Sequence, residues 1–179
     1  MSESVFGETY AAFLALHNSG DIPMRMEIQG IGLDPSWHVL EVGCGYGRCV
    51  EGLRARGLDA IGVDVNRWLI HSLARPYLRW GEIRHLDFLA NSFELVVCTD
   101  VLEHVAEYDQ AITELVRVSR NLIYVEVTTS ENSNYALDAT HCTALSSDGW
   151  RDALAAHADI IGSWGGWRFL LRKRGTAWH

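Results

Sequence analysis

A glycine-rich segment, LEVGCGYG at residues 40–47, overlaps and follows a short apolar run of the β-strand type at residues 38–42. An amphipathic stretch at residues 48–56 comes next and stops at Gly57, so we expect a strand, a tight turn and a helix. Glycine allows positive φ and a close approach of the backbone to a ligand, and the free N–H groups of a following helix favour a carboxylate. The segment therefore predicts a ligand-binding turn at the carboxyl end of a strand.

The rest of the chain continues this alternation of strand and helix patterns, which is typical of a parallel sheet with crossover helices. We expect further strands at residues 59–63, 82–86, 93–98 and 122–127, and helices at 67–75, 105–118 and 147–157. Two final apolar runs, 160–164 and 167–172, flank Gly165-Gly166 and predict a β-hairpin. The expected fold class is α/β: a Rossmann-like, doubly wound, seven-stranded sheet, mostly parallel, with a C-terminal antiparallel hairpin.

The length of 179 residues suits a single domain with one well-buried core. We expect residues 34–179 to form the Rossmann-like core. Residues 1–33 carry Tyr10, Phe13, Leu14 and Leu16, a spacing that suggests an amphipathic helix. This N-terminal part is interpreted either as a helical layer packed on the sheet or as a lid over a substrate cleft.

The composition narrows the choice of partners and location. A formal net charge of −8 argues against general binding to a nucleic-acid backbone. No stretch reaches the roughly 20 apolar residues of a membrane helix, and the N-terminus lacks a signal-peptide pattern. We therefore expect a cytoplasmic protein without membrane binding, as a monomer or homodimer. The cysteines Cys44, Cys49, Cys98 and Cys142 form no CxxC pair, and we expect reduced thiols.

Acidic residues follow the second and third predicted strands. Asp64 comes directly after residues 59–63, where a carboxylate can accept hydrogen bonds from both ribose hydroxyls. Asp87 follows residues 82–86, placed to meet an adenine amino group, with Phe88 beside the ring. Each acid alone is equally explained by a helix cap or a solvated turn. Together with the glycine turn, the two acids favour a ligand that contains adenosine.

With these features the chain resembles the class I S-adenosylmethionine-dependent methyltransferases. LEVGCGYG is similar to their first motif, IGVDVN to their ribose-binding strand end and HLDF to their adenine-contacting segment. FELVVCTDVLEHV resembles the fourth-strand motif of their small-molecule, ubiquinone-biosynthesis-like branch. The resemblance covers roughly residues 37–127 and implies S-adenosyl-L-methionine as cofactor, methyltransferase activity and a small-molecule methyl acceptor.

The resemblance also implies roles for single residues. Glu41 would order the loop and the methionine ammonium group, Asp64 would hold the ribose, and His104 would border the methyl-transfer cleft. The implied cofactor-binding residues are Glu41, Gly43, Cys44, Gly45, Gly47, Asp64, Val65, Asn66, Asp87, Phe88, Cys98 and Thr99.

Methyl transfer requires alignment of the acceptor and exclusion of water, and a base only where the acceptor loses a proton. The candidates for a base are Asp100, His104, Glu126 and His141. His141 leads because its unperturbed pKa suits proton transfer and its segment resembles the one that opens the last helix of many relatives. The alternative is that His141 only bonds backbone and fixes a loop. We expect no metal at Glu103, His104 and His141, because no tight ligand spacing supports one.

The acceptor side is less defined. Relatives often have a Pro-Asn turn where this chain has Thr128-Thr129, and an Arg-Pro-Gly-Gly turn where it has SRN at residues 119–121. The tryptophans Trp150, Trp164 and Trp167 are interpreted as packing residues. The loop 126–145 holds a polar set suited to a small hydrophilic acceptor: Glu131, Asn132, Asn134, Tyr135 and Asp138.

Three alternatives stay open. One is a catalytically inactive protein of the same fold that holds the cofactor or a partner. Another is an RNA or protein methyltransferase, which the absence of a basic patch argues against. The third is a nucleotide-dependent dehydrogenase, which Arg48 argues against because the dinucleotide fingerprint requires a small residue there.

Overall fold

The structure is a computed structural model that describes residues 21–133 and 135–176. The predicted helix around Tyr10, Phe13, Leu14 and Leu16 lies outside the described residues. The chain divides into two compact units, Met1–Glu82 and Ile83–His179. Its seven strands belong to one sheet, in the order β3-β2-β1 in the first unit and β4-β5-β7-β6 in the second.

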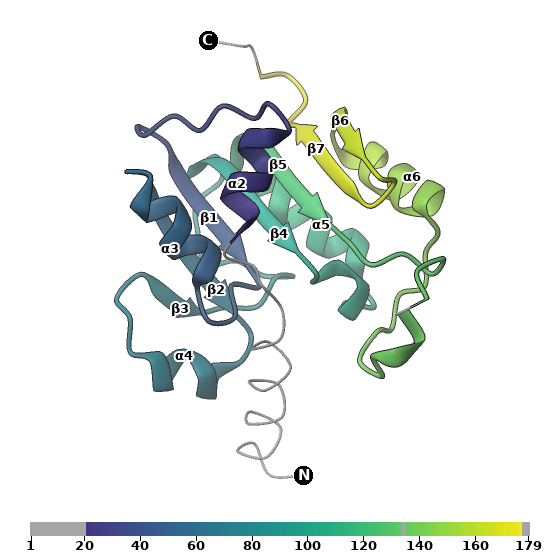
Figure 1. Ribbon diagram of the computed structural model, residues 1–179, viewed down its shortest axis with the longest axis horizontal. Helices are drawn as coiled ribbons and strands as arrows, with labels where there is room; N and C mark the ends of the chain where they lie inside the picture. The colour runs from purple at the N-terminus through teal and green to yellow at the C-terminus, as the bar shows by residue number, and fades with distance from the viewer. Residues whose placement is uncertain (1–20, 134, 177–179) are drawn as a thin grey trace. The chain divides into compact units, whose positions relative to one another are not determined.

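The first unit alternates helices and parallel strands (Figure 1). Its elements are α2 (Ile22–Ile28), β1 (His38–Val42), α3 (Arg48–Ala55), β2 (Asp59–Asp64), α4 (Arg67–Leu73) and β3 (Leu78–Trp80). β2 pairs in parallel with β1 and with β3. α3 packs against β2, and the α3 residues Cys49, Val50 and Leu53 are buried. The unit thereby buries one apolar face of α3 on its sheet.

The third strand lies earlier in the chain than predicted. Residues 82–86 were expected to form it, whereas β3 spans Leu78–Trp80 and residues 82–86 form turns and isolated bridges. The prediction is wrong because the residues that pair with β2 are 78–80 and not 82–86: Leu78 aligns with Gly62 and Trp80 with Asp64. A run of three residues is too short to show a period in the sequence.

The second unit contains the remaining strands and their helices. Its elements are β4 (Phe93–Thr99), η2 (Leu102–His104), α5 (Tyr108–Val118), β5 (Ser119–Glu126), η3 (Tyr135–Leu137), α6 (Ser147–His157), β6 (Asp159–Trp164) and β7 (Arg168–Arg172). β4 and β5 are parallel, and β7 lies antiparallel to both β5 and β6.

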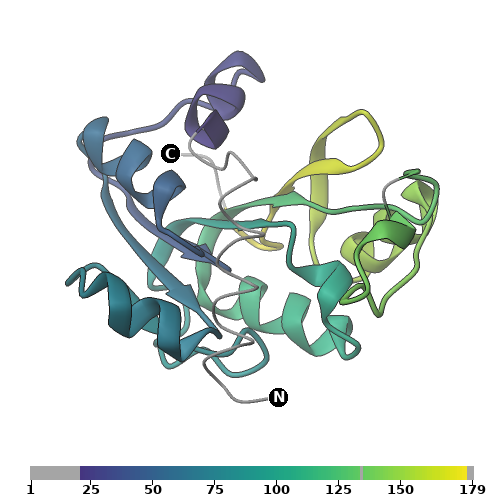
Figure 2. The same cartoon turned by 60° about the horizontal axis from the view of Figure 1, so that its bottom comes forward.

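Two helices cover one face of this part of the sheet. α5 packs on β4 and β5, and α6 packs on α5 and β6. Figure 1 shows both helices behind these strands, and Figure 2 shows the same arrangement after a turn about the horizontal axis. Trp150 of α6 is fully buried, with its ring 5.5 Å from that of Tyr108. The interpretation of Trp150 as a core residue is confirmed.

The C-terminal hairpin closes through residues 165–167, with Gly165 and Gly166 at φ +64° and +78°. The predicted fold class, a mostly parallel seven-stranded sheet with a C-terminal antiparallel hairpin, is confirmed. All four cysteines are free thiols, as predicted. Among the described residues, every helix is too short or too polar to cross a membrane.

Candidate active site

The glycine-rich turn of the first unit runs from the end of β1 to the start of α3. Gly43, Gly45 and Gly47 all have positive φ, +78°, +48° and +76°, a conformation that residues with a Cβ rarely adopt. The Gly43 and Cys44 N–H groups donate to the Val63 carbonyl at 2.9 and 3.0 Å. The Gly45 N–H donates to Asp64 Oδ2 at 2.8 Å. These bonds fasten the turn to the carboxyl end of β2.

Asp64 is buried at that strand end, with 1% of its surface exposed. Its Oδ1 accepts the Asn66 N–H at 2.8 Å, and Asn66 Oδ1 in turn accepts the Leu69 N–H and caps α4. Burial raises the pKa of Asp64, against the lowering effect of the two N–H donors. Asn66 Nδ2 is buried and has no hydrogen-bond partner within residues 21–133 and 135–176. The residue whose backbone bonds Asp64 thus also carries one unused donor, and the oxygens of Asp64 keep spare lone pairs.

Glu41 joins β1 to α3. It is 1% exposed, and its Oε2 accepts the Val50 N–H at 3.1 Å in the first turn of the helix. Burial raises the pKa of Glu41 to about 8, and the nearby charge of Asp64 adds to the increase. The role that the resemblance implies in ordering the loop is consistent with this contact.

An apolar surface adjoins the ends of β2 and β3. Val65 is 62% exposed and Trp80 is 48% exposed, and Trp80 Nε1 donates to the Val65 carbonyl at 3.1 Å. The Arg67 guanidinium lies 4.3 Å from the centre of the Trp80 ring. Sequence reasoning named Val65 but missed Trp80, because its place at a strand end depends on where β3 lies.

Asp87 and Phe88 lie in a bend of the second unit rather than at a strand end. Arg117 of α5 fixes this bend by donating to the carbonyls of Leu86 and Phe88, both at 2.7 Å. Phe88 packs edge-on against Phe93 with ring centres 5.0 Å apart, and Asp87 is exposed. The segment is positioned by a helix, although the sequence predicted a strand before it.

β4 ends in an unusual backbone conformation. Cys98 and Thr99 are buried, and the next residue, Asp100, has φ +53° although it carries a side chain. A non-glycine residue in this region costs on the order of 1 kcal/mol and often marks a functional site. Glu126, a candidate base, is 2% exposed, accepts the Tyr124 hydroxyl at 2.6 Å and lies 3.3 Å from Arg168 Nε. These contacts indicate a structural role for Glu126.

Glu103, His104 and His141, hereafter the Glu103 cluster, meet after β4. Backbone N–H groups of Cys142 and Thr143 donate to the Glu103 carbonyl at 2.9 and 3.0 Å, which brings His141 beside η2. The two imidazole rings have centres 4.6 Å apart. Burial and the neighbouring His141 lower the pKa of His104, and burial with the charge of Asp100 raises the pKa of Glu103 to about 7.

His141 also bonds the backbone, because its Nδ1 lies 2.7 Å from the Tyr135 carbonyl oxygen. Its ring stacks on that of Tyr135 at 4.7 Å. Both contacts fix the loop between η3 and α6, as the alternative interpretation of His141 expects. Neither occupies Nε2, so the nitrogen that a proton or an ion would use remains available.

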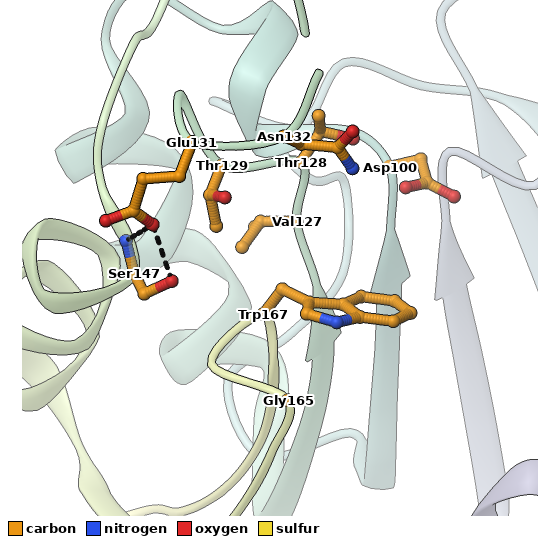
Figure 3. Close-up of a pocket in the computed structure, with 9 residues that line it drawn as sticks. All are labelled: Asp100, Val127, Thr128, Thr129, Glu131, Asn132, Ser147, Gly165 and Trp167. Carbon is orange, nitrogen blue, oxygen red and sulfur yellow. Dashed lines mark hydrogen bonds between the residues drawn. The ribbon is translucent and has the colours of Figure 1, made fainter. Parts of the chain in front are cut away.

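A pocket of about 390 Å³, hereafter the Trp167 pocket, lies in the second unit. Figure 3 shows the Trp167 ring across one side, facing Asp100, Thr128 and Asn132. Glu131 closes another side by accepting the Ser147 N–H and hydroxyl at 2.9 and 2.8 Å. The lining residues are Asp100, Val127, Thr128, Thr129, Glu131, Asn132, Ser147, Gly165 and Trp167.

The predicted polar set of the loop is divided in the structure. Glu131 and Asn132 line the Trp167 pocket, whereas Tyr135 contacts His141 and Asp138 Oδ2 lies 4.0 Å from His141 Nε2. Asn134 lies outside the described residues. Sequence reasoning interpreted Trp167 as a packing residue, but the three-residue turn presents it to the pocket. Its neighbouring glycines were the signal that could have indicated a turn position.

A glycine turn after β1, tied to an acid at the end of β2 in a doubly wound sheet, is an arrangement typical of the class of nucleotide-binding α/β proteins. Comparison with known proteins narrows the class. Residues 40–122 match the methyltransferase domain family. The chain is 31% identical over 109 residues to a ubiquinone biosynthesis O-methyltransferase of Hahella chejuensis, across 55% of this chain and 45% of the relative. It is 29% identical over 100 residues to a demethylmenaquinone methyltransferase of Renibacterium salmoninarum, across 54% and 42%.

Solved structures share the fold. A methyltransferase of Thermotoga maritima superposes with a TM-score of 0.66 at 13% identity, covering 92% of this chain and 98% of that one. One of Methanosarcina mazei gives 0.65 at 14% identity, covering 79% and 94%. Over residues 40–122 the chain is therefore similar to methyltransferases in sequence, and its fold is the one that these solved methyltransferases have. The chain spans less than half the length of the two curated relatives described here.

Proposed function

We propose that the protein binds S-adenosyl-L-methionine and transfers its methyl group to a small-molecule acceptor. The observation that carries the proposal is the hydrogen bond from the Gly45 N–H to Asp64 Oδ2 at 2.8 Å. It joins the glycine turn to the buried acid within the segment that matches a methyltransferase domain. In the family, this acid is the expected partner of the ribose.

The residues of the first unit fit an adenosine ligand. Each oxygen of Asp64 accepts one backbone N–H and keeps a lone pair for a hydroxyl donor. The buried Asn66 Nδ2 supplies a donor that has no acceptor among the described residues. Val65 and Trp80 offer exposed apolar surface of the kind on which a flat base packs. From the second unit, the resemblance adds Asp87, Phe88, Cys98 and Thr99.

S-adenosylmethionine, when bound, supplies a methyl group on a positively charged sulfur that an acceptor lone pair can attack in line. The chain's own residues have to bind and orient the acceptor and exclude water. We assign this task to the Trp167 pocket, with Trp167 as a flat apolar wall and Thr128 and Asn132 as polar contacts. Where the acceptor loses a proton, His141 or His104 would take it at Nε2.

The size of the pocket supports a small acceptor. Its volume of about 390 Å³ lies within the range usual for small-molecule sites. The curated relatives carry the names of ubiquinone-biosynthesis and demethylmenaquinone methyltransferases, which also points to small molecules. The polar side chains at the pocket further favour an acceptor that carries hydrogen-bonding groups.

Calorimetric titration tests the cofactor half of the proposal. We expect S-adenosylmethionine and S-adenosylhomocysteine to bind in the micromolar range and NAD not to bind. Asp64→Asn, which keeps the shape of the side chain, should weaken binding by roughly 10- to 100-fold, as expected for lost hydrogen bonds to a charged group. Asp152→Asn, at an exposed aspartate on α6, is the matched control and should bind as the wild type does. Folded protein that binds neither sulfur nucleotide contradicts the proposal.

A homocysteine-release assay with a panel of small hydroxyl- and amino-bearing acceptors tests the transfer half. We expect turnover with at least one acceptor and a strong decrease in Asn132→Leu, which removes a polar contact of the pocket while cofactor affinity stays unchanged. Cofactor binding without turnover of any acceptor would instead support a catalytically inactive protein of the same fold.

A further inference from the structure

The Glu103 cluster has a geometry that the proposed methyl transfer does not require. One potential ligating atom from each of Glu103, His104 and His141 lies within 4.8 Å of the other two. Glu103 and His104 come from η2, and His141 comes from the loop before α6. Thr143 Oγ1 donates to the Val105 carbonyl at 2.8 Å, which adds to the backbone bonds that hold the two segments together. The convergence is therefore built into the fold.

In both histidines, the hydrogen-bond partners place the ring hydrogen on Nδ1. The Thr140 hydroxyl donates to Asp138 Oδ1 at 2.6 Å, so at 2.9 Å from His104 Nδ1 it must accept the ring N–H. The Tyr135 carbonyl can only accept, so His141 Nδ1 also carries its hydrogen. Both rings therefore keep a lone pair at Nε2. An oxygen acceptor at the other ring nitrogen is the usual outer contact of a metal-bound histidine.

Glu103 supplies a buried carboxylate with one oxygen unused. The residue is 0% exposed, and its Oε1 accepts the Thr128 N–H at 2.6 Å. Its Oε2 is buried without a hydrogen-bond partner within the described part of the chain. An unpaired buried carboxylate oxygen is costly, and pairing with a cation offsets that cost.

We propose that Glu103, His104 and His141 bind one divalent transition-metal ion of the zinc class through Oε2 and the two Nε2 atoms. Two imidazoles and a carboxylate suit Zn²⁺ or Co²⁺ better than Mg²⁺, which prefers oxygen ligands alone. Bonds of about 2.1 Å place tetrahedral ligands roughly 3.4 Å apart, so atoms that now lie within 4.8 Å of one another would have to close by up to about 1.4 Å on binding. Three protein ligands leave a position open for water or another oxygen.

The competing explanation is a proton network without an ion. Asp138 Oδ2 lies 4.0 Å from His141 Nε2, longer than a hydrogen bond but close enough to attract a protonated ring. An ion would occupy the Nε2 lone pair that a general base needs. Metal binding and the role of His141 as a base therefore exclude each other in one molecule.

Metal uptake can be measured without activity. The chain, free of added histidines, is stripped with a chelator and titrated with Co²⁺ while visible absorption and calorimetry are followed; Zn²⁺ is then added in competition. We expect one ion per chain, d–d bands of a low-coordinate site and displacement by Zn²⁺. Glu103→Gln, which keeps the acceptor for Thr128, and His141→Ala should each weaken binding at least about tenfold. His38→Ala, at an exposed histidine of β1, is the matched control.

A folded wild-type chain that takes up no Co²⁺ or Zn²⁺, or binding that is unchanged in Glu103→Gln and His141→Ala, would overturn the metal site and leave the proton network. S-adenosylmethionine binding is measured on the same chelated protein and is expected to persist. Failure of the metal site is thereby distinguished from failure of the proposed function.

Discussion

At the scale of single residues, the first unit buries two acids a few residues from the same turn. Asp64 receives backbone N–H groups at both oxygens, whereas Glu41 receives the Val50 N–H at one. Burial disfavours the charged form of a carboxylate, and at Glu41 this effect outweighs the hydrogen bonds from the Val50 N–H and the Cys49 side chain. Glu41, whose pKa is raised to about 8, is therefore an acid of the first unit whose protonation state couples to folding.

The stability of the protein should fall with rising pH because of Glu41. Its pKa is raised from 4.5 to about 8 in the folded chain. Between these pH values the folded state holds a proton that the unfolded state has released, so stability decreases as pH rises through the window. The contribution is at most about 1.4 kcal/mol per pH unit.

Glu41→Gln should reduce this slope, because the amide oxygen can still accept the Val50 N–H and carries no charge. The part of the slope that comes from Glu103, whose pKa is raised to about 7, should remain. Urea unfolding at several pH values from about 5 to about 8.5 measures it, with the exposed Asp152→Asn as control. Parallel stability curves for wild type and Glu41→Gln would show that Glu41 does not titrate in this range.

Gly62 is required for packing rather than for its backbone angles. A Cβ at this position would lie 2.6 Å from Cys44 Cβ and 2.9 Å from Val50 Cγ2. Gly62→Ala should therefore destabilise the fold by about 1–3 kcal/mol, the usual cost of overpacking, as measured by urea unfolding. The control is Gly32→Ala, since a Cβ there meets nothing within 4 Å. Equal stabilities of the two variants would refute the close contact.

At the scale of elements, α5 positions a segment that has no regular structure of its own. Arg117 uses its guanidinium to bond two carbonyls of the 86–88 bend and both oxygens of Glu114. Leu86 N–H also donates to Glu114 Oε2 at 2.8 Å. A planar group with several donors can satisfy this set, whereas an ammonium group can reach only part of it.

Arg117→Lys should loosen the bend and with it the proposed adenine contacts of Asp87 and Phe88. We expect the dissociation constant for S-adenosylmethionine to rise by about three- to tenfold, the effect of roughly one lost hydrogen bond, as measured by calorimetry. Arg120→Lys, at an exposed arginine paired with Glu94, should leave it unchanged. If both variants bind like the wild type, the bend does not contribute to the cofactor site.

At the scale of the whole molecule, the excess of acidic residues argues against a nucleic-acid partner on electrostatic grounds. With 23 acidic and 15 basic residues, the chain has few cations to replace phosphate counterions. In an anisotropy titration with a labelled single-stranded RNA at about 0.15 M salt, we expect a dissociation constant no lower than roughly 10⁻⁴ M. Tighter binding with a steep salt dependence would instead favour an RNA methyltransferase.

Sedimentation of the protein alone tests the predicted monomer or homodimer.

The sequence predicted those parts of the fold that local signals determine. The glycine turn, the crossover helices and the hairpin glycines each follow from a short run of residues. β3 could not be located because three residues carry no period and the register with β2 selects them. The polar residues Glu131 and Asn132 were predicted on the acceptor side, but the wall that Trp167 adds to their pocket was not. Glu103, His104 and His141 were considered together and rejected as a metal site for lack of ligand spacing, because only the fold brings His141 next to the other two.

The boundary of the family match has a consequence for evolution. The match ends at residue 122, and every lining residue of the Trp167 pocket except Asp100 comes after it. Most substitutions that reshape the pocket would therefore fall in a stretch of chain that contains neither the glycine turn nor Asp64. If the Trp167 pocket binds the acceptor, as proposed, a lineage that keeps the glycine turn can exchange one acceptor for another by altering the loop after β5 and the tip of the hairpin. Chimaeras joined just beyond β5 should then inherit their acceptor preference from the C-terminal parent.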